Sequence, residues 1–173
     1  ARLQQLLQTK NKVFFATASG TGVMEACVRN CVSKRILNLI CGEFGERWHE
    51  IAKMNGKEAS PLRVDLGKAI KPEMVKNALA SGQCDAVALT HNETSTGVMN
   101  PLAEIAAVVK EFPDVTFMVD AVGSMGGAKI QVDDWGIDVC LASTQKGFGL
   151  PPGFAVFSVS DKALKKAATI PQR

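Results

Sequence analysis

The 173 residues suffice for one domain with a sizeable core, because 46% of them are hydrophobic and only 21% are charged. The net charge of +3 is spread along the chain, so no basic stripe indicates nucleic-acid binding. No apolar run reaches the roughly 20 residues that cross a bilayer, and the first residues lack the apolar core of a signal peptide. We therefore expect a cytoplasmic protein without membrane contact.

The first half of the chain alternates between helical and strand-like segments. Leucines at helical spacing predict the end of a helix over 2–8, and β-prone residues predict a short strand over 13–17. The turn Ser19-Gly20-Thr21-Gly22 then leads into a helix over 23–30, with Ser19 or Thr21 as its N-cap. A buried strand over 35–41, a loop over 42–45 and a helix over 48–56 that stops at Gly56 follow.

The second half repeats this alternation. A weaker strand is predicted over 62–66, and a proline at its start and a glycine beyond its end predict a helix over 72–79. A buried strand over 85–90 leads into a long polar loop over 91–100 and an amphipathic helix over 101–109. Further strands are predicted over 115–119, 137–142 and 154–159, and Asp161 is predicted to cap a last helix through 168.

Strands that alternate with helices indicate an α/β fold with a largely parallel sheet. One strand is expected to be an exception. Only about a dozen residues, half of them loop-forming, separate the strands over 137–142 and 154–159. A parallel return needs a crossover of at least that length, usually a helix, so the strand over 154–159 is predicted to be antiparallel.

Five of the predicted strands end in short polar loops, which we expect to converge on one rim of the sheet. In open parallel sheets, ligands bind beyond the carboxyl ends of the strands. Lys146 lies in such a loop and either points to water or reaches a ligand. Asp120 ends an apolar strand and either anchors its loop or pairs with a ligand cation. Ser19-Gly20-Thr21, at a helix start, is either a plain turn or an anion site.

The cysteines and histidines do not suggest a metal site. The five cysteines are an odd number, mostly inside apolar runs, and are expected to be reduced thiols. There is no CxxC pair, and the chain has only two histidines. We therefore expect no bound metal.

A lysine, an acid, an anion nest and an aromatic plate are the set that pyridoxal phosphate requires. Here five motifs stand in the order seen in class V aminotransferases: SGTGVMEA, GEFGERW, THNETSTGVMNPL, VDAVGSMGG and STQKGFGLPPG. The chain most resembles the serine-pyruvate and alanine-glyoxylate aminotransferase group. The resemblance, from about residue 14 to 160, implies the three-layer large domain of fold type I, with a seven-stranded, mostly parallel sheet and one antiparallel strand.

The resemblance also implies a role for each of nine residues. Lys146 resembles the lysine that forms the Schiff base with the cofactor, and Asp120 the acid that pairs with its pyridine nitrogen. Val122 and Phe44 would pack on opposite ring faces, with Phe44 where relatives usually have tryptophan. Ser19, Gly20, Thr21 and Gln145 would hold the phosphate, and Thr94 would lie near the phenolic oxygen.

The implied reaction is transamination between a small amino acid, of the alanine, serine or aspartate type, and a 2-oxo acid such as glyoxylate or pyruvate. Relatives are homodimers of about twice this length. Residues 1–173 therefore resemble a large domain without its N-terminal segment and C-terminal small domain, which carries the arginine for the substrate carboxylate.

Three alternatives remain. A lyase such as a cysteine desulfurase typically has histidines where this chain has Gln145 and Phe44. A fragment without catalysis would serve only for packing or partner binding. A nucleotide-binding Rossmann domain would need a glycine fingerprint that the sequence lacks.

Overall fold

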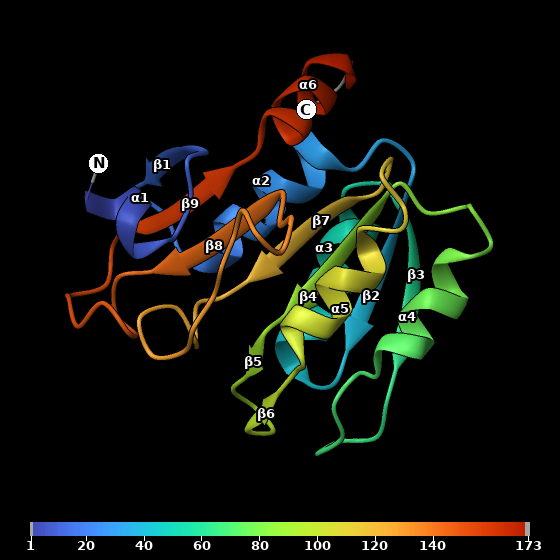
Figure 1. Ribbon diagram of the computed structural model, residues 1–173, viewed down its shortest axis with the longest axis horizontal. Coiled ribbons are helices and arrows are strands. Elements are labelled where there is room, and N and C mark those ends of the chain that lie inside the picture. The colour runs from blue at the N-terminus through green and yellow to red at the C-terminus, as the bar shows by residue number, and fades with distance from the viewer. Residues whose placement is uncertain (1, 172–173) are drawn as a thin grey trace.

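A seven-stranded sheet forms the middle layer of the molecule in the computed structural model, which describes residues 2–171 (Figure 1). Its strands are β1 (Lys12–Ala16), β2 (Arg35–Ile40), β3 (Glu58–Arg63), β4 (Ala86–Thr90), β7 (Thr116–Asp120), β8 (Val139–Ser143) and β9 (Ala155–Val159). They lie in the order β1-β9-β8-β7-β4-β2-β3. Only β9 is antiparallel to its two neighbours, β1 and β8. The predicted α/β class and the single antiparallel strand are confirmed.

Helices cover both faces of the sheet and complete the three layers. They are α1 (Arg2–Leu6), α2 (Gly20–Cys31), α3 (Glu43–Met54), α4 (Pro72–Leu79), α5 (Leu102–Val109) and α6 (Asp161–Thr169). Buried side chains of α2, α3 and α6 form one apolar core with the sheet, and those of α4 and α5 form the other. In Figure 1, α4 and α5 lie in front of the sheet and α3 lies behind it.

The central strands are buried on both faces, which explains their apolar composition. Every residue of β4, β7 and β8 is buried, and each strand is a nearly continuous apolar run. This pattern is typical of parallel strands that are covered by helices on both sides. It also places their polar terminal residues, Thr90, Asp120 and Ser143, at one end of the sheet.

Local signals mark the starts of two helices, although α2 begins at Gly20, within the predicted turn, and not at residue 23. Ser19, one of the two predicted caps, is the N-cap of α2, and its side chain accepts a hydrogen bond from the Gly22 N–H. Helix α4 begins at Pro72, whose missing N–H costs nothing in the first turn. The five cysteines are free thiols, as expected.

The loops predicted over 42–45 and 91–100 are wrong in part. Helix α3 already begins at Glu43, and a small hairpin of β5 (Asn92–Glu93) and β6 (Val98–Met99) occupies the second segment. The early start of α3 has an identifiable cause, because the carboxylate of Glu93 accepts hydrogen bonds from the N–H groups of Phe44 and Gly45. A distant side chain thus caps a helix start that has no side-chain cap of its own.

Two further boundaries differ from those predicted. Strand β3 covers 58–63 rather than 62–66, because it pairs in parallel with β2 from Glu58 onward. It is an edge strand, where Pro61 is tolerated and the apolar signal is weak. Ser160, and not Asp161, caps α6, since its hydroxyl accepts a hydrogen bond from the Ala163 N–H at 3.1 Å. Asp161 is the first residue of the helix.

No helix within residues 2–171 has both the length and the apolar character needed to cross a membrane.

Candidate active site

Five loops meet at one end of the sheet, where the parallel strands β1, β2, β4, β7 and β8 end. Together they line a cavity of about 210 Å³. All nine residues singled out in the sequence line it: Ser19, Gly20, Thr21, Phe44, Thr94, Asp120, Val122, Gln145 and Lys146. The predicted convergence of the loops is confirmed, and the surroundings of each side chain indicate what it can do.

The N-terminus of α2 forms one wall of the cavity. The Ser19 side-chain oxygen accepts a hydrogen bond from the Gly22 N–H at 3.2 Å. The N–H groups of Gly20 and Thr21 have no acceptor among residues 2–171. They carry the positive end of the helix dipole. This wall is therefore suited to an anion such as a phosphate.

Gly20 allows the helix to approach the sheet closely. A Cβ atom at this position would lie 2.8 Å from Val122 Cγ2 and 3.0 Å from Ser143 Oγ. Both distances are shorter than an ordinary contact, so any side chain would push α2 away from the loops that follow β7 and β8. The glycine thus keeps the helix N-terminus next to these two loops.

Asp120 is a buried carboxylate at the end of β7, with 3% of its surface exposed. Its Oδ1 accepts a hydrogen bond from the Val122 N–H at 2.8 Å, and it forms no ion pair within residues 2–171. Burial raises the pKa of Asp120 to about 6, with a smaller upward contribution from the Glu93 carboxylate. A cationic group bound in the cavity would stabilise the ionised form and lower this pKa.

Lys146 lies in the loop between β8 and β9, and its side chain is exposed. Its Nζ makes no hydrogen bond or ion pair with the described part of the chain, so the amine is available to a ligand. Thr144 closes the loop, because its N–H donates to the Phe154 carbonyl at 3.1 Å and its Oγ1 donates to the Pro151 carbonyl at 2.7 Å.

A glycine beside the lysine fixes the loop against its neighbour. A Cβ atom at Gly147 would collide with the carbonyl of Met125. Gly126, which follows Met125, has a φ of +89°, a conformation that favours glycine. The contact between these two loops therefore depends on glycine in both of them, and it holds the residue next to Lys146 against the neighbouring loop.

Phe44 and Val122 form the apolar walls of the cavity, and both are half-buried. Phe44 is held by its backbone, whose N–H donates to Glu93 Oε2 at 3.0 Å. Thr94 follows Glu93 directly and is exposed at the rim. Its hydroxyl would lie 3.5 Å from a Cβ atom at Gly123. One buried carboxylate thus orders both the aromatic wall and the rim loop.

The cavity is also lined by five residues that sequence reasoning did not select: Met24, Arg47, Asn92, Gly123 and Ser143. Ser143 is the most informative, because its hydroxyl is buried and has no partner among residues 2–171. In the sequence, the only signal for Ser143 was its position directly before the Thr144-Gln145-Lys146 segment. That position does not show on which face of β8 the Ser143 side chain lies. Arg47 gave no signal, since it is one of many basic residues.

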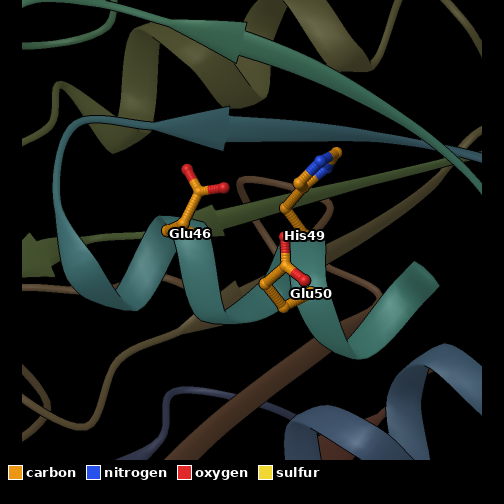
Figure 2. Close-up of side chains that lie close together, drawn as sticks. All are labelled: Glu46, His49 and Glu50. Atoms are coloured by element: carbon orange, nitrogen blue, oxygen red, sulfur yellow. The ribbon is translucent and has the colours of Figure 1, made fainter. Parts of the chain in front are cut away.

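A second group of ligand-type side chains lies on α3, outside the cavity. Figure 2 shows Glu46, His49 and Glu50, whose potential metal-ligand atoms lie within 4.8 Å of one another. Both carboxylates are already paired, Glu46 with Arg63 at 2.7 Å and Glu50 with Lys53 at 3.1 Å. We therefore assign this group to surface ion pairs rather than to a metal centre.

The chain matches the model of the family described as "Aminotransferase class-V" over residues 6–171. The chain belongs to the class-V aminotransferase family. In this family, an uncharacterised aminotransferase of Methanocaldococcus jannaschii is 41% identical over 94% of this chain and 43% of its own length. A protein of Synechococcus named as the small subunit of a soluble hydrogenase is 39% identical over 99% of this chain and 47% of its own length.

A comparison with solved structures shows that the chain also shares its fold with aminotransferases. The crystal structure of an alanine-glyoxylate aminotransferase from Nostoc superposes with a TM-score of 0.93, at 32% identity, over 99% of this chain and 46% of that one. The chain therefore has the fold of these aminotransferases. It spans a little under half the length of the relatives that it matches.

Proposed function

We propose that the protein to which this chain belongs transfers an amino group between a small amino acid, of the alanine, serine or aspartate type, and a 2-oxo acid such as glyoxylate or pyruvate. Its proposed cofactor is pyridoxal 5′-phosphate. The observation that carries the proposal is one cavity lined by the free amine of Lys146, the buried carboxylate of Asp120 and the uncapped N–H groups of α2. The Nostoc relative bears the name of such an enzyme.

The cavity residues fit this cofactor by charge and by shape. Ser143 offers a buried hydroxyl without a partner in the described chain, and the α2 N-terminus suits the phosphate. Phe44 and Val122 provide apolar walls for a flat ring. This set matches aminotransferase chemistry, which is why we carry over that function rather than the one named in the Synechococcus relative.

Each residue has a distinct task in the proposed reaction. Lys146 would hold the cofactor through its amine, and the same amine, once freed, would take up the proton that leaves the substrate's α-carbon. Asp120 would stabilise a positive charge at the ring nitrogen. When bound, the cofactor supplies a ring that accepts the electron pair left on the α-carbon. Gln145 and Thr94 orient the phosphate and the phenolic oxygen.

We also propose that residues 1–173 are the cofactor-binding large domain of a longer chain. This agrees with the share of the relatives that it covers. A small C-terminal domain would supply the arginine that binds the substrate carboxylate. The proposed assembly is a homodimer in the cytoplasm.

The proposal is tested by trapping the cofactor on the chain. Pyridoxal 5′-phosphate should turn the purified chain yellow, and borohydride reduction with peptide mapping should place the pyridoxyl group on Lys146. Lys146→Arg should abolish the label, whereas Lys129→Arg, at an exposed lysine that does not line the cavity, should retain it. A label on another lysine, or none, would contradict the proposal.

The reaction itself is tested on the complete protein. Alanine or serine with glyoxylate should yield the corresponding 2-oxo acid and glycine. Release of sulfide from cysteine without amino transfer would instead identify a lyase of the same fold, and cofactor binding without either reaction would identify a non-catalytic protein.

A further inference from the structure

Helix α3 packs against α2 and places a positive charge at the cavity that the N-terminus of α2 also lines. The charge belongs to Arg47, whose side chain is exposed at the cavity. Its Nη1 donates a hydrogen bond to Thr21 Oγ1 at 3.0 Å. Its guanidinium carbon lies 4.7 Å from the centroid of the Phe44 ring. One side chain thus connects the anion-binding wall with the aromatic wall.

Arg47 differs from three other arginines because no carboxylate pairs with it in the described part of the chain. Arg29, Arg35 and Arg63 each form an ion pair, with Glu25, Glu58 and Glu46 respectively. A guanidinium with no carboxylate partner, beside a helix N-terminus with free N–H groups, creates a site that lacks only its anion.

The hydrogen bond to Thr21 has a directional consequence. Because Thr21 Oγ1 accepts from Arg47, the hydroxyl's own hydrogen points away from the guanidinium and can be donated to an acceptor in the cavity. The positive charge of the Arg47 guanidinium polarises the Thr21 hydroxyl and makes it a stronger hydrogen-bond donor. The Ser143 hydroxyl, buried and without a partner in the described chain, lines the same cavity and supports the presence of an anionic acceptor there.

We propose that Arg47 is a positioning residue that acts on the phosphate of the cofactor through Thr21 and makes the site select pyridoxal 5′-phosphate over unphosphorylated pyridoxal. The proposal rests on the proposed function. The stacking of Arg47 on Phe44 keeps the guanidinium in the orientation that the Thr21 bond requires. The selectivity would thus arise from a residue outside the loop that forms the anion nest.

The test compares the affinities for the two forms of the cofactor. The dissociation constants of pyridoxal 5′-phosphate and of pyridoxal are measured by absorbance for the wild-type chain, Arg47→Ala, Arg47→Gln and Arg47→Lys. Arg47→Ala and Arg47→Gln should weaken binding of the phosphorylated form roughly 10- to 100-fold and change pyridoxal binding less than about twofold. Arg47→Lys should recover part of the loss, because it restores the charge without the planar fork.

A matched control removes a charge of the same kind far from the cavity. Arg29→Ala, on the exposed face of α2, should leave both affinities unchanged. A higher salt concentration should reduce the difference in affinity for pyridoxal 5′-phosphate between wild type and Arg47→Gln. Salt screens the Arg47 charge because this charge lies near the surface.

The outcomes separate this inference from the proposed function. If the wild-type chain binds the phosphorylated form on Lys146 and Arg47→Gln binds it equally well, the role of Arg47 is refuted and the proposed function stands. Equal loss of both ligands would also refute it, because Arg47 would then act only by holding Phe44. If the wild-type chain binds neither ligand, both proposals fail.

Discussion

At the scale of a single residue, the ionisation of Asp120 makes the stability of the folded chain depend on pH. Its pKa of about 6 in the folded chain lies above the ordinary value of 3.8, because burial disfavours the ionised form. Between these two values the folded chain binds more protons than the unfolded chain. The free energy of unfolding therefore falls as the pH rises from about 4 to 6, by about 3 kcal/mol from this group.

Asp120→Asn should remove this dependence and weaken cofactor binding. The difference in unfolding free energy between the variant and the wild-type chain should move in favour of the variant as the pH rises through that window. At pH 7 the variant should bind pyridoxal 5′-phosphate at least tenfold more weakly, since an amide cannot balance a cationic ring nitrogen.

The pH profile of cofactor binding provides the check on Asp120. Wild-type affinity should decrease below about pH 6, where the carboxylate takes up a proton, and the Asp120→Asn affinity should not show that decrease. Identical profiles for the two chains would show that the carboxylate has a structural role only.

At the scale of the elements, Glu93 joins two segments that lie far apart in the sequence. Its buried carboxylate accepts hydrogen bonds from the N–H groups of Phe44, Gly45 and Ser95 and from the Ser95 hydroxyl. Glu93→Gln would place an amide NH₂ against some of these donors. We expect a loss of about 2–3 kcal/mol in unfolding free energy, measured by urea denaturation.

The neighbouring Glu43 offers a control for the Glu93 variant. It lies in the first turn of the same helix but is exposed, so Glu43→Gln should change the unfolding free energy by less than about 0.5 kcal/mol. Equal effects of the two substitutions would mean that the helix dipole, and not the buried cap, is what matters.

Gly147→Ala tests whether the contact between two loops sets the position of Lys146. The added methyl would meet the Met125 carbonyl, and overpacking of this kind costs about 1–3 kcal/mol. The variant should bind pyridoxal 5′-phosphate more weakly than wild type. In Gly127→Ala the added methyl meets only the Ser124 carbonyl, at 3.7 Å, so stability and binding should be retained. If both variants bind pyridoxal 5′-phosphate as tightly as wild type, the position of Lys146 does not depend on this contact.

The sequence predicted the elements whose signals are local. The strands β4, β7 and β8 are apolar runs, and α4 lies between a proline and a glycine. The start of α3 was missed because its cap comes from Glu93, about 50 residues later in the chain. The same limit applies to the cavity. Its nine predicted residues lie in recognisable motifs, whereas the positions of Arg47 and Ser143 depend on how α3 and β8 pack.

At the scale of the whole molecule, we predict a partner subunit from exposed apolar side chains near the cavity. Met99 in the β5-β6 hairpin is 54% exposed, and Leu150 in the loop between β8 and β9, which carries Lys146, is 57% exposed. Apolar groups on the surface beside a ligand site commonly mark an interface, and a two-fold pairing would cover both on each subunit.

Sedimentation of the complete protein should therefore show a homodimer with and without cofactor. Met99→Asp and Leu150→Asp should each shift the equilibrium toward monomer, because they place a charge in an apolar contact. Met54→Asp is the control, since that side chain is 78% exposed and lies at the C-terminal end of α3, whose opposite end lines the cavity. A monomer that binds the cofactor tightly and turns over would contradict the dimer.

Strand β9 also determines the order in which the domain can assemble on the ribosome. Strand β1 is bonded only to β9 within the described sheet, although almost the whole described chain lies between them. The other strands can begin to pair as they are synthesised, but β1 must wait until Val159 has left the exit tunnel, and such distant pairing is slow. Ser19 and the start of α2 follow β1 directly, so the segment that leads into the anion-binding wall of the cavity is anchored at its N-terminal side only when β9 is in place. We therefore expect a nascent chain to bind the cofactor tightly only after β9, which follows Lys146 in the sequence, has been synthesised.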